Sequence, residues 1–194
     1  MEVQKHGNLY EDMVITLLTG LSKLTLNNYT SVWDIPAGIA GELPVSIKTT
    51  GTSTVACGDI LRMILHDNYK LIVGKWKQIE GKKRFYQQYT FTITPEDTEK
   101  LWGDMSYDTL SPFVEFVKGI PAGREAQQAT KVERNQLKEE LESTGGVFTI
   151  NPKVDSKKQR RVQCSVTIDN LISAGVSYTV EDIEYTITSA QRQF

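Results

Sequence analysis

VSIKTT, at residues 45–50, is the stretch on which the fold prediction depends. Apolar and polar residues alternate along it, so Val45 and Ile47 should share one face of a β-strand. Ser46 and Lys48 then share the opposite face. The pattern predicts a half-buried strand that carries one lysine on its polar side.

The segment before this strand carries glycines and prolines in an otherwise apolar extended run, from Asp34 to Pro44. Ahead of it, Tyr29 to Trp33 has the β-branched and aromatic character of a strand. The pattern favours a β-hairpin whose turn falls around Gly38–Gly41. Such a hairpin would bring Asp34 beside Lys48.

Other elements are expected on both sides of the hairpin. Apolar residues recur at helical spacing before it, which predicts an amphipathic helix at about residues 8–25. After it, Thr52 or Ser53 is a potential N-cap for a second helix that runs to about His66. The remaining expected elements are strands at 69–76 and 85–93 joined through Gly81, helices at 95–105, 109–118 and 124–143, and strands at 147–151 and 161–168. This mixture predicts an α/β fold with a central mixed β-sheet flanked by helices.

The composition is that of a globular protein. A length of 194 residues suits one domain over residues 1–194 with a substantial core. No apolar run is long enough to cross a bilayer, and the first residues do not resemble a secretory signal. We therefore expect a cytoplasmic protein of bacterial or viral origin with no membrane contact. Cys57 and Cys164 are expected to be reduced thiols, and any metal should be held by oxygen ligands, because no Cys/His cluster is present.

The charge is unevenly distributed. A formal net charge of −2 and a pI of about 5.8 disfavour nucleic-acid binding by themselves. Carboxylates gather at 133–142 and 181–184, however, whereas a dense basic run consists of Lys153, Lys157, Lys158, Arg160 and Arg161. This run is either a solvated loop or a DNA-binding surface, and we assign DNA binding to it.

The predicted hairpin carries the residue types that phosphodiester hydrolysis requires. That reaction needs carboxylates to hold a divalent cation and a positive group beside the attacking water and the phosphate. Asp34 would bind the metal, and Lys48 would orient the water and neutralise developing charge. The helix expected before the hairpin carries Glu11 on its flank.

These residues resemble the PD-(D/E)xK nuclease superfamily, which includes type II restriction endonucleases and archaeal-type Holliday junction resolvases. The family order is a helix with Glu, a strand with Asp, a strand with an acid-x-Lys motif, and then a helix packed on the sheet. The chain follows this order from the helix that starts near Gly7 to about residue 65. The resemblance implies a restriction-endonuclease-like core at 1–94, with elements for DNA recognition or dimerisation at 95–194. It further implies Mg²⁺ as cofactor with Mn²⁺ as a possible substitute, double-stranded DNA as substrate, and a homodimer.

The chain departs from the family pattern at one position. Ser46 stands two positions before Lys48, where the family usually has Asp or Glu. Some members with Ser at this position use a carboxylate from the following helix, and Asp59 is the residue that would fill this role. Glu42, in the loop between the two strands, is the competitor. The expected metal ligands are therefore Asp34 with Asp59 or Glu11, and the departure leaves the second ligand open.

Each of these residues also has an ordinary structural explanation. Lys48 could be solvated on its strand, and Asp34 could simply start a turn. Glu11 could complement the dipole of its helix in a first turn, and Asp59 could do the same for a second helix.

The expected function is a sequence-specific type II restriction endonuclease. Three alternatives stay open. One is a junction-resolving or repair nuclease of the same fold. Another is a catalytically inactive DNA-binding module, and the last is an interaction protein that assembles through the polar helix at 124–143.

Overall fold

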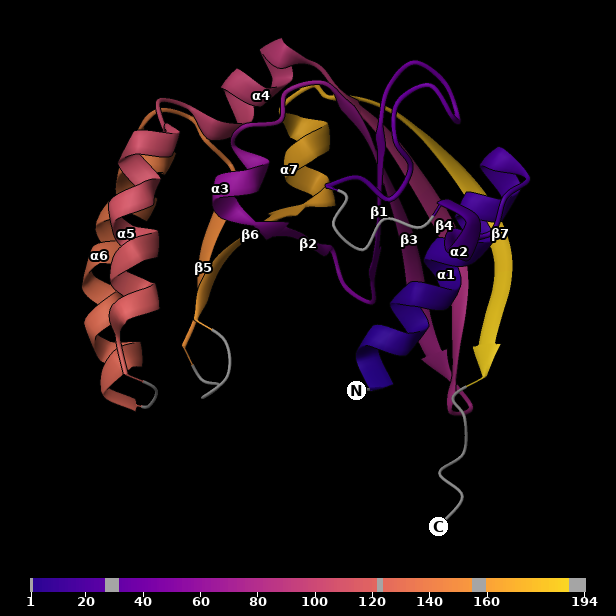
Figure 1. The fold of residues 1–194 in the computed structure, drawn as a ribbon, viewed down its shortest axis with the longest axis horizontal. Coiled ribbons are helices and arrows are strands. Elements are labelled where there is room, and N and C mark those ends of the chain that lie inside the picture. Colours follow the sequence, from indigo (N-terminus) through magenta and orange to yellow (C-terminus); the bar gives the residue numbers. More distant parts are fainter. Residues whose placement is uncertain (1, 27–31, 122–123, 155–159, 189–194) are drawn as a thin grey trace. The chain divides into compact units, whose positions relative to one another are not determined.

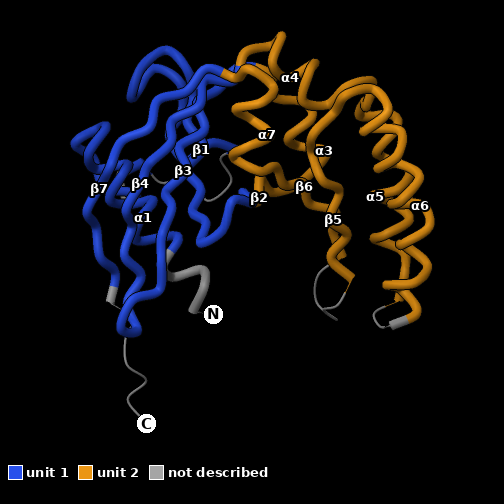
Figure 2. The backbone as a smooth tube through the Cα atoms, turned by 180° about the vertical axis from the view of Figure 1, so that it is seen from behind, with its two compact units in different colours: residues 1–55, 68–93, 177–194 blue, residues 56–67, 94–176 orange. Residues whose placement is uncertain are grey.

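The computed structural model describes residues 2–26, 32–121, 124–154 and 160–188. The chain forms two compact units (Figure 2). Unit 1 consists of residues 1–55, 68–93 and 177–194, and unit 2 of residues 56–67 and 94–176. Both units are discontinuous in sequence, because the chain leaves unit 1 twice and returns to it twice.

Unit 1 contains a four-stranded mixed sheet with the strand order β1-β3-β4-β7. The strands are β1 (Val45–Thr50), β3 (Tyr69–Ile79), β4 (Lys82–Ile93) and β7 (Ser177–Thr188). β1 runs parallel to β3, and the other neighbours are antiparallel. The β3–β4 turn places Glu80 and Gly81 at positive φ, as the glycine predicted.

Helix α1 (Glu2–Thr19) covers one face of this sheet, and the short helix α2 (Lys23–Leu26) follows it (Figure 1). Tyr10 on α1 is fully buried; its ring stacks on Phe85 with the ring centroids 4.3 Å apart, and its hydroxyl donates to Gln88 Oε1 at 2.7 Å. The ring also lies directly over Gly74, where a Cβ atom would overlap it. This close contact fixes α1 against β3 and β4.

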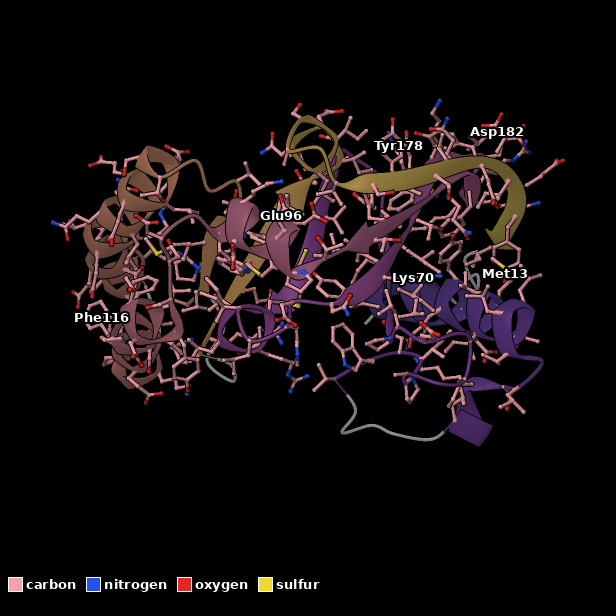
Figure 3. All side chains as sticks on the ribbon, turned by 90° about the horizontal axis from the view of Figure 1, so that it is seen from above. Met13, Lys70, Glu96, Phe116, Tyr178 and Asp182 are labelled. Carbon is pink, nitrogen blue, oxygen red and sulfur yellow. The ribbon has the colours of Figure 1, made fainter. Side chains whose placement is uncertain are left out.

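The opposite face of the sheet in unit 1 carries side chains of β7. In Figure 3, Tyr178 and Asp182 project from β7 on the side away from α1, whose Met13 lies on the other side. Tyr178 is 41% exposed and contacts Phe91 with the ring centroids 5.6 Å apart. Helix α1, which carries Glu11, therefore packs against the other face of the sheet.

Unit 2 contains a three-stranded sheet with the order β2-β6-β5, and five helices are described with it. The strands are β2 (Thr54–Asp59), whose first residues belong to unit 1, β5 (Thr149–Lys153) and β6 (Arg161–Thr167). The helices are α3 (Ile60–Met63), α4 (Pro95–Trp102), α5 (Tyr107–Gly119), α6 (Arg124–Ser143) and α7 (Ile168–Ser173). The protein is thus of mixed α/β class, as predicted, and none of the described helices is long and apolar enough to cross a membrane.

Three of the expected elements differ from the structure. The single helix expected at about residues 8–25 is divided into α1 and α2, because residues 20–22 are not helical. The helix expected from residue 52 to residue 66 is wrong: strand β2 occupies its first half, and only the short α3 is helical. Alternating burial of Val55 and Cys57 and a positive φ at Gly58 explain the strand, since neither suits a helix. The strand expected at Tyr29–Trp33 lies partly outside the described residues, and its last two residues form a bend.

Candidate active site

The side chain of Asp34 is held against the edge of β1. An isolated antiparallel bridge joins Ile35 to Val45, so only a minimal form of the expected hairpin is present. The bridge aims the Asp34 carboxylate along β1, where Oδ2 accepts the Ile47 N–H at 2.5 Å. The Asp34 side chain is 22% exposed, so it is shielded and yet accessible to a small ligand.

Lys48 and Ser46 both reach the same carboxylate oxygen. Lys48 Nζ lies 3.4 Å from Asp34 Oδ2 and donates to the Ile47 carbonyl at 3.1 Å. The Ser46 hydroxyl lies 3.5 Å from Asp34 Oδ2, and the residue is only 5% exposed. The side chains that share the polar face of β1 therefore meet Asp34, as the alternation predicted.

Glu11 joins this group from the middle of α1. Its pKa is raised, first by burial and then by the nearby negative charge of Asp34, with which it also shares a hydrogen bond. Lys23 opposes the shift through an ion pair with Glu11 Oε1 at 2.8 Å. A first-turn role for Glu11 does not apply, because α1 begins at Glu2.

Lys23 is the member of the group that the sequence did not reveal. It follows Gly20, which ends α1 at a positive φ, and its backbone N–H donates to Asp12 Oδ1 at 2.9 Å. This hydrogen bond returns the chain towards Glu11. Only the folded geometry shows the pairing, since no local motif links Glu11 to Lys23.

The result is a row of charged groups in unit 1: Lys23, Glu11, Asp34 and Lys48. Two carboxyl groups lie in contact at the centre of the row, with an ammonium group at each end. Such a pair favours the presence of a positive charge, because each carboxylate makes ionisation of the other less favourable. Hard divalent cations such as Mg²⁺ are usually held by one or two carboxylates with water completing the shell, so these residues fit one.

Glu42 and Asp59 do not complete this pair in the described structure. No group of three His, Cys, Asp or Glu side chains suited to a metal occurs among the described residues, so Glu42 does not join Glu11 and Asp34. Glu42 is exposed in the segment before β1. Asp59 belongs to unit 2, where its side chain is the N-cap of α3 and accepts the Arg62 N–H at 3.1 Å. That local role accounts for the Asp59 carboxylate.

The basic run has mixed surroundings. Lys153 and Arg161 are exposed and lie opposite each other on β5 and β6. Arg160 is partly buried, and its Nε donates to the Ile120 carbonyl at 3.1 Å, so this residue has a structural role as well. Lys157 and Lys158 lie outside the described residues.

The convergence of Glu11, Asp34 and Lys48 is thus a finding of the geometry of unit 1. No family model, curated protein or solved structure matches the chain.

Proposed function

We propose that the protein is a Mg²⁺-dependent endonuclease that hydrolyses phosphodiester bonds of double-stranded DNA. The observation that carries the proposal is the meeting of Glu11, Asp34 and Lys48, which come from a helix, a bridge segment and a strand. A purely solvated Lys48 or a turn-forming Asp34 would not need to lie beside a half-buried glutamate.

Asp34 and Glu11 would hold the divalent cation. When bound, Mg²⁺ would lower the pKa of a water molecule and offset negative charge on the phosphate. Mn²⁺ prefers similar oxygen donors and should substitute for it. The hydrogen bond from the Ile47 N–H fixes the Asp34 carboxylate, so the ligand is oriented before the cation arrives.

Lys48 would act on the substrate. Its ammonium group already bridges Asp34 Oδ2 and the Ile47 carbonyl, and its side chain is 28% exposed. From this position it can donate a hydrogen bond to the attacking water or to a phosphate oxygen. A positive charge at that point stabilises the transition state more than the ground state, because charge on the phosphate develops during attack.

The more specific function that we propose is that of a type II restriction endonuclease, which has a restriction-endonuclease-like core and acts as a homodimer. It rests on the resemblance of the motif order. A junction-resolving or repair nuclease would use the same residues and differ in recognising DNA shape. The inactive DNA-binding module is the strongest rival from another class, because Ser46 supplies a hydroxyl where the family has a carboxylate.

The test compares the wild type with Lys48→Ala and Asp34→Asn on phage and plasmid DNA in Mg²⁺, in Mn²⁺ and in EDTA. Lys70→Ala is the matched control, because Lys70 lies on the neighbouring strand β3 of the same sheet. We expect discrete metal-dependent fragments from the wild type and the control, and a loss of roughly 10²–10³-fold or more in rate for both site variants. Discrete fragments also separate a restriction enzyme from a structure-selective nuclease. Intact DNA with every metal and sequence would exclude catalysis and favour the inactive module.

A further inference from the structure

A groove in unit 2 has no part in the candidate active site. It lies between α6 and β5, has a volume of about 370 Å³, and is lined by Gln127, Thr130, Lys131, Arg134, Asn151, Pro152, Lys153 and Val154. Three of these lining residues are cationic and none is acidic. The groove is therefore positively charged although the whole chain carries a formal net charge of −2.

The periodicity of the two elements builds this lining. On α6, helical spacing places Gln127, Lys131 and Arg134 on one side of the helix. On β5, Asn151 and Lys153 are separated by one residue and so lie on the same face of the strand. Asn151 is fixed there, because its amide donates to Ser165 Oγ at 2.9 Å.

The positive charges of the groove are not neutralised within the described part of the chain. Lys131, Arg134 and Lys153 form none of the ion pairs found among the described residues. By contrast, Lys138 on the same helix is paired with Glu142 at 3.4 Å. Arg134 Nη2 donates to Asn135 Oδ1 at 2.7 Å, which orients the guanidinium group without cancelling its charge.

We propose that this groove binds the phosphodiester backbone of DNA, an inference that rests on the proposed function. A row of unpaired Lys and Arg side chains with amide groups between them matches the contacts that proteins make to phosphate oxygens. Lys131 and Arg134 extend the binding surface beyond the basic run of the sequence and add α6 to it. The groove gives affinity and position and no base specificity, since phosphates are the same at every step.

The test measures the affinity of the full-length chain for a fluorescently labelled duplex in EDTA, so that binding is separated from cleavage. The triple variant Lys131→Gln, Arg134→Gln, Lys153→Gln is compared with the wild type over a range of salt concentrations. Each lost phosphate contact should reduce the slope of log K against log salt by about 0.9, so the triple variant should lose roughly 2–3 units. Lys138→Gln, on the same helix but in an ion pair, is the control and should bind as the wild type does.

A second variant guards against a folding defect. Lys131→Arg, Arg134→Lys, Lys153→Arg exchanges the same side chains and keeps their charge, so it should retain the affinity and the salt slope. An unchanged salt slope in the neutral triple variant would overturn the inference. So would a charge-conserving variant that binds as weakly as the neutral one while both have the circular dichroism spectrum of the wild type.

Cleavage assays with the same proteins distinguish this inference from the proposed function. We expect the neutral triple variant to raise KM for DNA and leave kcat unchanged. A wild type that binds DNA through the groove but never cleaves it would contradict the nuclease and keep the groove. A wild type that cleaves DNA while the groove variants bind normally would support the nuclease and overturn the inference about the groove. A wild type that does not bind DNA at low salt would overturn both.

Discussion

At the scale of single residues, the ionised Glu11 side chain should destabilise the folded protein at neutral pH. Its pKa is raised by burial and by Asp34, so the folded chain binds the proton of Glu11 more tightly than the unfolded chain does. The contribution of Glu11 to stability is then greatest below its ordinary pKa of 4.5, and it is lost as the pH rises through the raised pKa of the folded chain. We expect Glu11→Gln to abolish cleavage and to raise the denaturation midpoint at neutral pH.

The measurement is urea denaturation of the wild type and of Glu11→Gln between about pH 4 and pH 8, a range that spans the titration of a raised glutamate. The difference between the two proteins should grow with pH. Glu99→Gln, an exposed residue on α4, provides the control and should shift the midpoint at no pH. A variant that is less stable than the wild type at neutral pH would show that the ion pair with Lys23 outweighs burial and the repulsion by Asp34.

Ser46 allows a second prediction, because it replaces the expected acid. A carboxylate at this buried position would lie beside Asp34 and Glu11 and would add a third negative charge. We expect Ser46→Asp to lose about 1–3 kcal/mol or more of stability in EDTA, the usual penalty for a buried unsatisfied group, and to regain much of it in Mg²⁺ or Mn²⁺. Thermal denaturation with and without metal measures this.

The uncharged variant Ser46→Asn is the control for the prediction at Ser46. It has nearly the same size as Asp and should show the same metal response as the wild type. Equal metal responses in Ser46→Asp and Ser46→Asn would mean that a carboxylate at position 46 does not contribute to cation binding.

At the scale of elements, the start of α4 shows how a local motif acts on stability alone. Thr94 and Asp97 form a reciprocal capping box: the Thr94 N–H donates to Asp97 Oδ2 at 3.0 Å, and the Asp97 N–H donates to Thr94 Oγ1 at 3.2 Å. Thr94→Ala removes one half of it and should cost about 1 kcal/mol of stability. Chemical denaturation should record this loss, whereas the cleavage rate at low temperature should match that of the wild type; Thr94→Ser, which keeps the cap, should be close to neutral.

The elements that were predicted from sequence are those with strong local signals. The sequence has Thr94 and Pro95 at the start of α4, strong helix formers over 124–143 where α6 lies, and Gly81 between the two strands of the β3–β4 hairpin. The helix predicted over residues 52–66 was wrong because β2 is short. Its alternating pattern competes with the apolar residues at 60–65, which also suit a helix. Its pairing with β6, a partner distant in sequence, decides between the two.

The residues of the candidate site also differ in how far the sequence predicted them. Asp34 and Lys48 followed from the alternation of β1 and from a polar residue in an apolar run, and both are where that reasoning placed them. Glu11 was selected by motif order, and its contact with Asp34 depends on how α1 packs on the sheet. Lys23 was missed, because its pairing is set by the turn after Gly20, and Asp59 was chosen without knowing that it caps α3.

At the scale of the whole molecule, the predicted division at residue 94 does not coincide with the two units. Unit 1 contains residues 1–55 and 68–93 but also 177–194, which hold β7. β7 pairs with β4 from Thr92↔Ser177 to Lys82↔Thr188, and its Ile187 is buried in the core with Tyr10 and Phe85. The segment 1–94 therefore lacks one strand of its own sheet and part of its own core.

We expect a protein consisting of residues 1–94 alone to be unfolded or aggregated, because β4 would become an open edge strand and apolar core surface would be exposed. A matched variant keeps β7 by replacing residues 94–176 with an Asn-Gly turn, since Thr92 and Ser177 are already neighbours in the ladder. This variant retains 56–67 as the crossover between the parallel strands β1 and β3. Circular dichroism should show sheet structure only in the variant with β7, and light scattering should detect aggregates of the truncated chain. A soluble 1–94 fragment with the sheet signal and cleavage activity would show that β7 is dispensable and that the first 94 residues form the catalytic domain by themselves.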